Sequence, residues 1–286
     1  MKDKLFSLLP PCSYQGGKQR LCEKILNIIE EENNSGFVFY DLCCGSGSVG
    51  LEAFNRGYEV ILVDKGPFGL FWEKIGNNTF DLDIFRSEID KLPSVEGIQR
   101  YLKDLSDRPV DENLFVYHYL LLQAGSFGSK QIWIEGNKWC NNSFRSYWLP
   151  TESSNRKSPV NPMMPMPETL YSRVENIVFN QNDKIQGYYK DVFDVIDIIK
   201  QDTRNKVIYI DPPYMNTTGY FDNFDIYELI DKLIDKLGKD TPIYVSEGCT
   251  LNNAREIILS EGRKKGNVSG TVKKSPVIET LNVFNR

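Results

Sequence analysis

Four consecutive residues, Asp211-Pro-Pro-Tyr214, follow the apolar run 207–210 and combine a carboxylate, two prolines and an aromatic ring. A buried strand would place them at its carboxyl end, where ligands bind in open α/β sheets. Pro212 and Pro213 fix φ and donate no backbone hydrogen bond, so the turn is stiff and extended. The Asp211 carboxylate and the Pro212 carbonyl can accept both protons of an amino group on a planar heterocycle, while Tyr214 stacks on its ring. We therefore predict an amine-binding loop, with an ordinary Asp-Pro turn as the alternative.

A glycine-rich segment, Asp41-Leu-Cys-Cys-Gly45-Ser-Gly47-Ser-Val-Gly50, has the G-x-G-x-x-G spacing of a nucleotide-cofactor loop. It follows one apolar run, and a second apolar run ends at Asp64, whose carboxylate can accept ribose hydroxyls. The spacing alone fits a dinucleotide or S-adenosylmethionine. Asp41 favours S-adenosylmethionine, because its carboxylate would repel a pyrophosphate and can face the ammonium of a methionine group. The amine-binding loop also has no role in hydride transfer.

The elements that must position these residues alternate between strands and helices, which predicts a Rossmann-like α/β sheet with helices on both faces. Apolar runs predict strands at 37–42, 58–64, 206–214, 243–247 and 278–284. Helical spacing predicts helices from Leu21 through Ile29 and over 49–56, 111–124 and 225–237, another within 184–202, and one over 253–261.

The middle of the chain differs in composition. Trp133, Trp139 and Trp148 lie within 125–168, together with five prolines and many Gly, Ser and Asn. From Phe127 to Arg173 there are six Lys or Arg against three Glu and no Asp, a net charge of +3. So long a stretch is not an ordinary loop. We interpret 71–173 as an inserted target-recognition lobe, and 1–70 with 174–286 as the catalytic domain; a merely structural insertion is the alternative.

The 286 residues carry a formal net charge of −5. This net charge argues against a protein that binds nucleic acid mainly through the electrostatic attraction of its whole surface, because such domains are usually basic. A local basic groove is compatible with that total. Its predicted DNA-contacting residues are Lys130, Lys138, Arg145, Arg156, Lys157, Arg263, Lys264 and Lys265.

The six cysteines have no C-x-x-C spacing, and a single histidine, His118, leaves too few partners for a Cys/His zinc site. We expect no metal, and reduced cysteines, which indicate the cytoplasm. No signal peptide or membrane span is expected, because the longest apolar run, 114–124, is too short to cross a bilayer.

The order of motifs resembles that of the Dam-like group of DNA adenine methyltransferases: Tyr14-Gln-Gly-Gly17-Lys18, then the glycine loop, then an insertion, then Asp211-Pro-Pro-Tyr214. The resemblance covers nearly the whole length and is weakest over 125–170. It implies transfer of a methyl group from S-adenosylmethionine to the exocyclic N6 amine of an adenine that is flipped out of DNA. The enzymes of this group commonly belong to restriction-modification systems.

The resemblance also assigns roles to residues. The catalytic motif would be Asp211, Pro212, Pro213 and Tyr214. The cofactor would contact Tyr14, Gly17, Lys18, Asp41, Gly45, Gly47, Asp64 and Asp191. Asp191 matches the family's Asp-Phe segment less well than the other positions match theirs, because Val192 separates it from Phe193.

Three other functions compete with this one. The same fold can act on RNA or on cytosine, although cytosine enzymes usually have Ser in place of Asp211. A nicotinamide-dependent oxidoreductase would use the glycine loop and Asp64. A non-enzymatic DNA-binding protein could retain the fold, but the intact Asp211, Tyr214 and glycine loop argue against it.

Overall fold

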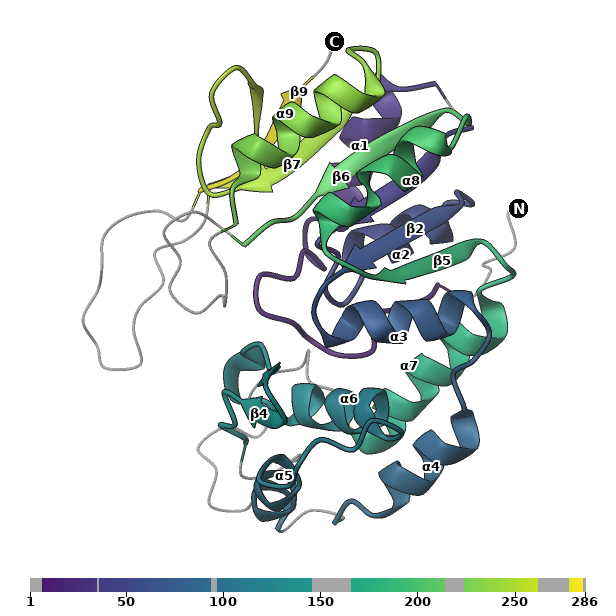
Figure 1. Ribbon diagram of the computed structural model, residues 1–286, viewed down its shortest axis with the longest axis vertical. Coiled ribbons are helices and arrows are strands. Elements are labelled where there is room, and N and C mark those ends of the chain that lie inside the picture. Colours follow the sequence, from purple (N-terminus) through teal and green to yellow (C-terminus); the bar gives the residue numbers. More distant parts are fainter. Residues whose placement is uncertain are drawn as a thin grey trace, which may run out of the picture.

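The computed structural model describes residues 7–34, 36–93, 97–145, 166–213, 224–261 and 278–284. Within these residues the centre of the protein is a seven-stranded sheet with the order β5-β2-β1-β6-β7-β9-β8 (Figure 1). Its strands are β1 (Val38–Leu42), β2 (Val60–Asp64), β5 (Ile185–Tyr189), β6 (Lys206–Ile210), β7 (Ile243–Glu247), β8 (Arg255–Glu261) and β9 (Ile278–Phe284).

The strands β5, β2, β1, β6 and β7 are parallel, and β9 runs antiparallel to both of its neighbours, β7 and β8. Numbered along the chain, the parallel strands have the order 3-2-1-4-5 of a doubly wound fold. Strands β1, β2 and β7 are buried along their whole length. This burial on both faces explains why their sequences read as continuous apolar runs.

Helices cover both faces of the sheet and form two separate hydrophobic cores (Figure 1). On one face lie α1 (Cys22–Glu32), α2 (Ser48–Asn55) and α3 (Pro67–Gly76), and on the other lie α8 (Ile196–Gln201) and α9 (Ile226–Leu237). Helix α3 approaches β5 closely at Gly187, where a Cβ atom would lie 2.1 Å from the carbonyl carbon of Trp72. The predicted Rossmann-like sheet with helices on both faces is therefore confirmed.

The lobe below the sheet in Figure 1 is mainly helical. It contains α4 (Leu82–Asp90), α5 (Ile98–Ser106), α6 (Phe115–Gly125), the 3-10 helix η1 (Phe127–Ser129), the hairpin of β3 (Trp133–Glu135) and β4 (Lys138–Cys140), and α7 (Pro167–Asn180). Helix α6 forms its centre, with both α4 and α5 packed against it. Residues 71 and 173, the predicted ends of the insertion, lie inside α3 and α7, and the division into two parts stays a proposal.

One predicted helix is wrong, and two strands of the seven-stranded sheet were not predicted. Residues 255–261, within the expected helix 253–261, form strand β8 along β9, so that Leu259 is buried while Ile258 is 47% exposed. The helix predicted within 184–202 is present as the short α8, but a strand, β5, and the 3-10 helix η2 (Val192–Val195) precede it in that segment. These two unpredicted strands, β5 and β8, lie at the two edges of the sheet, where pairing with a distant strand overrides the local sequence pattern.

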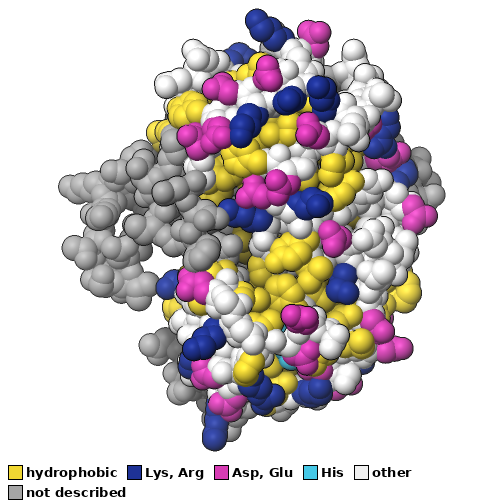
Figure 2. Space-filling model, viewed as in Figure 1, with side chains coloured by type: hydrophobic (Ala, Val, Ile, Leu, Met, Phe, Trp, Pro, Cys, Tyr) yellow, Lys and Arg dark blue, Asp and Glu magenta, His cyan; other side chains and the backbone are white. Residues whose placement is uncertain are grey.

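Charge is mixed on the face of the protein that Figure 2 shows. On the face in Figure 2, acidic and basic side chains alternate over the described residues, and hydrophobic side chains gather near the middle. In the described ranges, no helix combines the length and the hydrophobicity needed to cross a bilayer.

Candidate active site

Strands β1 and β6 are parallel neighbours, and their carboxyl ends lie side by side. The order in which the chain adds strands to the sheet reverses between these two strands. Leu42 pairs with Ile210, and the Asp211 backbone N–H donates a 3.1 Å hydrogen bond to the Leu42 carbonyl. The glycine loop after β1 and the Asp-Pro-Pro segment after β6 therefore begin side by side. Both line a cavity of about 660 Å³, a size typical of small-molecule sites, at the place where such folds bind ligands.

The loop between β1 and α2 needs its glycines. Gly45 and Gly47 have φ angles of +49° and +74°, which most side chains disfavour. A Cβ atom on Gly45 would lie 2.7 Å from the Tyr14 ring, and one on Gly47 would lie 2.5 Å from the Trp72 ring. The buried indole N–H of Trp72 donates a 2.9 Å hydrogen bond to the Gly45 carbonyl. The loop is thus fixed with its backbone against the cavity.

Asp64, the last residue of β2, supports this loop and borders the cavity. Its two carboxylate oxygens accept hydrogen bonds from the backbone N–H groups of Gly45 (2.8 Å) and Gly66 (2.6 Å). Burial raises the pKa of the Asp64 carboxyl, and the two backbone donors oppose this shift. Each oxygen retains a lone pair, so the carboxylate can still accept a hydroxyl of a bound ligand.

Asp41, near the end of β1, is almost completely buried, with 1% of its surface exposed. One carboxylate oxygen, Oδ2, accepts a 2.8 Å hydrogen bond from the Gly50 N–H. Within the described residues, the other oxygen, Oδ1, has no hydrogen-bond partner. Burial raises the pKa of Asp41 well above its ordinary value, and the nearby Asp211 and Asp64 carboxylates raise it further. A cation in the cavity would lower the free-energy cost of keeping this buried carboxylate charged.

Asp211 forms a buried ion pair with Lys18. The Lys18 ammonium lies 2.6 Å from Oδ1 of Asp211 and also donates a 2.9 Å hydrogen bond to the Gly16 carbonyl. Burial raises the pKa of the Asp211 carboxyl, and the Lys18 charge opposes the shift. The Lys18 side chain is 3% exposed and that of Asp211 is 19% exposed. The motif around Tyr14 and the Asp-Pro-Pro motif thus touch each other.

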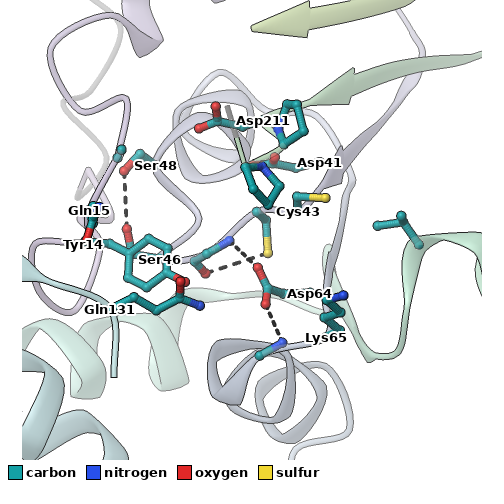
Figure 3. Close-up of a pocket in the computed structure, with 18 of the residues that line it drawn as sticks. Tyr14, Gln15, Asp41, Cys43, Ser46, Ser48, Asp64, Lys65, Gln131 and Asp211 are labelled. Atoms are coloured by element: carbon teal, nitrogen blue, oxygen red, sulfur yellow. Dashed lines mark hydrogen bonds between the residues drawn. The ribbon is translucent and has the colours of Figure 1, made fainter. Parts of the chain in front are cut away.

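The turn before Lys18 is closed by a 3.0 Å hydrogen bond from the Gly17 N–H to the Tyr14 carbonyl. Tyr14, Gly17, Pro212 and Pro213 all line the cavity. Figure 3 shows Asp41 and Asp211 on one side of this space and Asp64 on another, each carried by a different strand end.

Asp191 also lines the cavity. One of its carboxylate oxygens caps η2 by accepting the Phe193 N–H at 3.0 Å, and the other lies 3.6 Å from the Lys65 ammonium. Phe193 itself packs against Phe224 and is not among the cavity residues. Seven of the eight residues of the predicted cofactor set thus line the cavity. The eighth, Gly47, lies in the same loop but packs against Trp72.

The predicted DNA-contacting residues are only partly described. Lys130 and Lys138 are exposed and Arg145 is half-buried, and none of the three lines the cavity. Tyr214, Arg156, Lys157, Arg263, Lys264 and Lys265 lie outside the described residues.

Several cavity residues were not predicted from the sequence. Four of them come from the lobe: Phe115, Gln131, Trp133 and Ile134. Tyr189 and Glu279 come from β5 and β9. No local motif marks these positions, since only the fold brings them to the cavity.

All six cysteines are free, and in the described ranges no three His, Cys, Asp or Glu side chains cluster as a metal site would require. The features that suit a ligand are instead an unsatisfied buried carboxylate oxygen on Asp41 and a loop that lines the cavity at Gly45 and Ser46. These features fit a cationic nucleoside such as S-adenosylmethionine, whose methionine group carries an ammonium.

Comparison with known families points the same way. Residues 14–101 match the family model of the D12 class N6 adenine-specific DNA methyltransferases. This match confirms the predicted resemblance to Dam-like adenine methyltransferases, and enzymes of this kind use S-adenosylmethionine as the methyl donor. It gives no support to a nicotinamide-dependent oxidoreductase. No curated protein matches the sequence significantly.

Two solved structures are similar over most of the chain. A hypothetical protein of Thermus thermophilus is 13% identical, with a TM-score of 0.40, covering 98% of this chain and 94% of that one. The rRNA methyltransferase AviRa from Streptomyces viridochromogenes is 12% identical, with a TM-score of 0.38, covering 93% of this chain and 84% of that one. Similarities this weak carry no weight for the substrate.

Proposed function

We propose that this chain, whose residues 14–101 match the D12 class of adenine-specific DNA methyltransferases, transfers a methyl group from S-adenosylmethionine to the N6 amine of adenine in DNA. One observation carries the proposal: Asp211 and Pro212 line the same cavity as the glycine loop and Asp64. An amine acceptor and a nucleoside cradle therefore share one space. We also infer a cytoplasmic location, because all six cysteines are free.

On the donor side, Asp41 would face the ammonium of the methionine group, and Asp64 would accept the ribose hydroxyls. Gly45 would let the backbone approach the ligand, while Gly47 lets the loop pack against Trp72. Asp191 and Tyr14 would border the two ends of the ligand. S-adenosylmethionine, when bound, supplies a methyl group activated by attachment to a positively charged sulfur. The lobe residues Trp133 and Ile134 would exclude water from this side.

On the acceptor side, the Asp211 carboxylate and the Pro212 carbonyl would each accept one N–H of the adenine amine. Two acceptors held in one stiff turn draw the amine toward tetrahedral geometry, so that the nitrogen lone pair points at the methyl group. The N–C bond would form as the S–C bond breaks, leaving S-adenosylhomocysteine, and the methylated amine would then pass one proton through the Asp211 carboxylate to solvent. Much of the rate would come from this positioning.

Lys18 bonds Oδ1 of Asp211, so the second carboxylate oxygen, Oδ2, can accept the amine. Lys18 would then hold Asp211 ionised while the base enters the site. The target adenine is inaccessible in a duplex and has to be flipped out. By resemblance, Tyr214 would stack on the flipped base, worth about 1–3 kcal/mol.

The test is methyl transfer from labelled S-adenosylmethionine to duplex DNA, followed by mass spectrometry of the nucleosides. We expect N6-methyladenine with the wild-type protein. Asp211→Ala should lower kcat by at least about 10³-fold, with S-adenosylhomocysteine affinity changed by less than about threefold. Asp235→Ala, which removes an exposed carboxylate on α9, is the matched control and should behave as wild type.

Two outcomes would contradict the proposal. Methylated cytosine, or methylation of RNA alone, would assign a different substrate to the same fold. Full activity of Asp211→Ala would remove the amine-binding role of the Asp-Pro-Pro loop.

A further inference from the structure

One wall of the donor cavity comes from the lobe and not from the sheet. The segment that leads from α6 into β3 brings Gln131, Trp133 and Ile134 to the cavity. These residues lie far in sequence from Asp64 and from the glycine loop. The donor site is therefore assembled from two parts of the fold.

The segment carrying Gln131 is held firmly. Gln123, fully buried on α6, donates its side-chain N–H to the Lys130 carbonyl at 3.1 Å and accepts the Ile132 N–H at 3.0 Å. The Gln131 carbonyl accepts a 2.7 Å hydrogen bond from the Asn141 side chain. Ile132 is completely buried in the core, and its neighbour Gln131 lines the cavity.

The Gln131 amide and the Asp64 carboxylate both lie close to Gly66. A Cβ atom on Gly66 would be 3.9 Å from Nε2 of Gln131, and the Gly66 N–H is itself bonded to Asp64 Oδ1. Figure 3 shows the Gln131 side chain extending into the cavity, between Tyr14 and Asp64 in this view. No hydrogen bond to this half-buried amide occurs among the residues that the structure describes.

We propose that Gln131 binds the ribose of the methyl donor together with Asp64, an inference that rests on the function proposed above. An ionised carboxylate can only accept, and each Asp64 oxygen already accepts one backbone N–H. A ribose hydroxyl that donates to Asp64 still needs a donor for its own oxygen, and the Gln131 Nε2 can supply it. The lobe then contributes directly to donor affinity.

The test is isothermal titration of Gln131→Ala with S-adenosylhomocysteine and with 5′-methylthioadenosine, which keeps the ribose and adenine but lacks the amino-acid group. Loss of one neutral hydrogen bond should weaken both ligands by about 3- to 10-fold. Gln131→Glu should weaken them more, because it replaces the donor with a second carboxylate beside Asp64. Gln186→Ala, an exposed glutamine on β5 away from the cavity, is the matched control and should bind as wild type.

Unchanged affinity of Gln131→Ala for both ligands would overturn the inference while leaving the proposed function intact. A loss seen with S-adenosylhomocysteine but not with 5′-methylthioadenosine would place the Gln131 contact on the amino-acid group, and would overturn the ribose assignment. A wild-type protein that binds neither ligand would instead refute the proposed function, and this inference with it.

Discussion

The ammonium of Lys18 lies 2.6 Å from a carboxylate oxygen of Asp211, although 193 residues separate the two along the chain. Both side chains are largely withdrawn from water, so the charges are weakly screened. The contact ties the N-terminal turn to the amine-binding loop. It also opposes the rise in the Asp211 pKa that burial causes.

Lys18→Met should raise the pKa of Asp211, because burial already raises it and Lys18 is the group that opposes the shift. A protonated Asp211 accepts the amine poorly. Activity should therefore fall as the pH drops through the pKa of Asp211. Because this pKa is higher in the variant, its activity should begin to fall at a higher pH than that of the wild type. We expect kcat near neutral pH to decrease about tenfold, or ~1.4 kcal/mol in the barrier.

The measurement is kcat against pH for Lys18→Met and for Lys24→Met, whose exposed ammonium bonds backbone carbonyls of β8 away from the cavity. The second variant should reproduce the wild-type profile. An acid limb of Lys18→Met that coincides with that of the wild type would show that the ion pair does not control Asp211.

Asp41→Asn should stabilise the ligand-free protein and weaken donor binding. The amide oxygen can still accept the Gly50 N–H, while the buried charge is removed. The folded pKa of Asp41 is raised above that of the unfolded chain, about 3.9, so the folded state retains a proton that the unfolded state loses. The free energy of unfolding of the wild type, relative to that of the variant, should thus fall as the pH rises from about 4 to the pKa of Asp41 in the folded protein.

Thermal unfolding across this pH range measures the first effect, and we expect the variant's Tm to be higher by about 2–4 °C at neutral pH, as ~1 kcal/mol produces. Titration with S-adenosylhomocysteine measures the second. Loss of a charge-assisted hydrogen bond to the ammonium should weaken binding by about 10- to 100-fold. Wild-type affinity in Asp41→Asn would mean that the ammonium lies elsewhere.

The sequence predicted the elements that carry a continuous local signal. Strands β1, β2, β6 and β7 are buried on both faces, and α9 has an apolar stripe, so their patterns were readable. Strand β8 was mistaken for a helix because Ile257, Ile258 and Leu259 fit either period. Only pairing with β9 makes Leu259 buried and Ile258 exposed.

In the candidate site, too, the residues with a local sequence signal were predicted and those that only the tertiary fold brings together were not. The glycine loop and Asp64 belong to one continuous βαβ unit, so local spacing was enough to group them. The contacts of Lys18 with Asp211 and of the Gln131 segment with the cavity depend on how distant parts pack. Such contacts leave no trace in local spacing, and they were not predicted.

Gly47→Ala should destabilise the protein more than Gly128→Ala, although the two glycines have nearly the same backbone conformation, with φ of +74° and +70°. Both variants force a side chain into the left-handed region, at a cost of about 1–2 kcal/mol. Only at Gly47 would the new Cβ also overlap the Trp72 ring, at 2.5 Å, while nothing lies within 4 Å of Gly128. We expect a total loss of about 2–5 kcal/mol at Gly47.

Urea unfolding of the two variants measures the difference directly. Equal losses would show that Trp72 moves aside freely and that the loop is not held by close packing. Donor affinity should also fall in Gly47→Ala, since the cradle shifts, and should be unchanged in Gly128→Ala.

Gln123→Leu should lower both the stability of the lobe and the affinity for the donor. The fully buried Gln123 amide bonds the Lys130 carbonyl and the Ile132 N–H, and leucine can bond neither. The Lys130 carbonyl keeps its 2.8 Å bond from Ser126, but the Ile132 N–H loses its side-chain partner. An unsatisfied buried group costs about 1–3 kcal/mol, which urea unfolding can measure.

Because the same bonds hold the segment that carries Gln131, the variant should also bind S-adenosylhomocysteine more weakly, by about as much as Gln131→Ala. Gln99→Leu is the control, because Gln99 is an exposed glutamine of the same lobe that also bonds a backbone carbonyl, that of Phe144. It should leave donor affinity unchanged and cost no more than about 1 kcal/mol of stability. A destabilised Gln123→Leu that keeps full affinity would show that the wall of the cavity holds its position without this clamp.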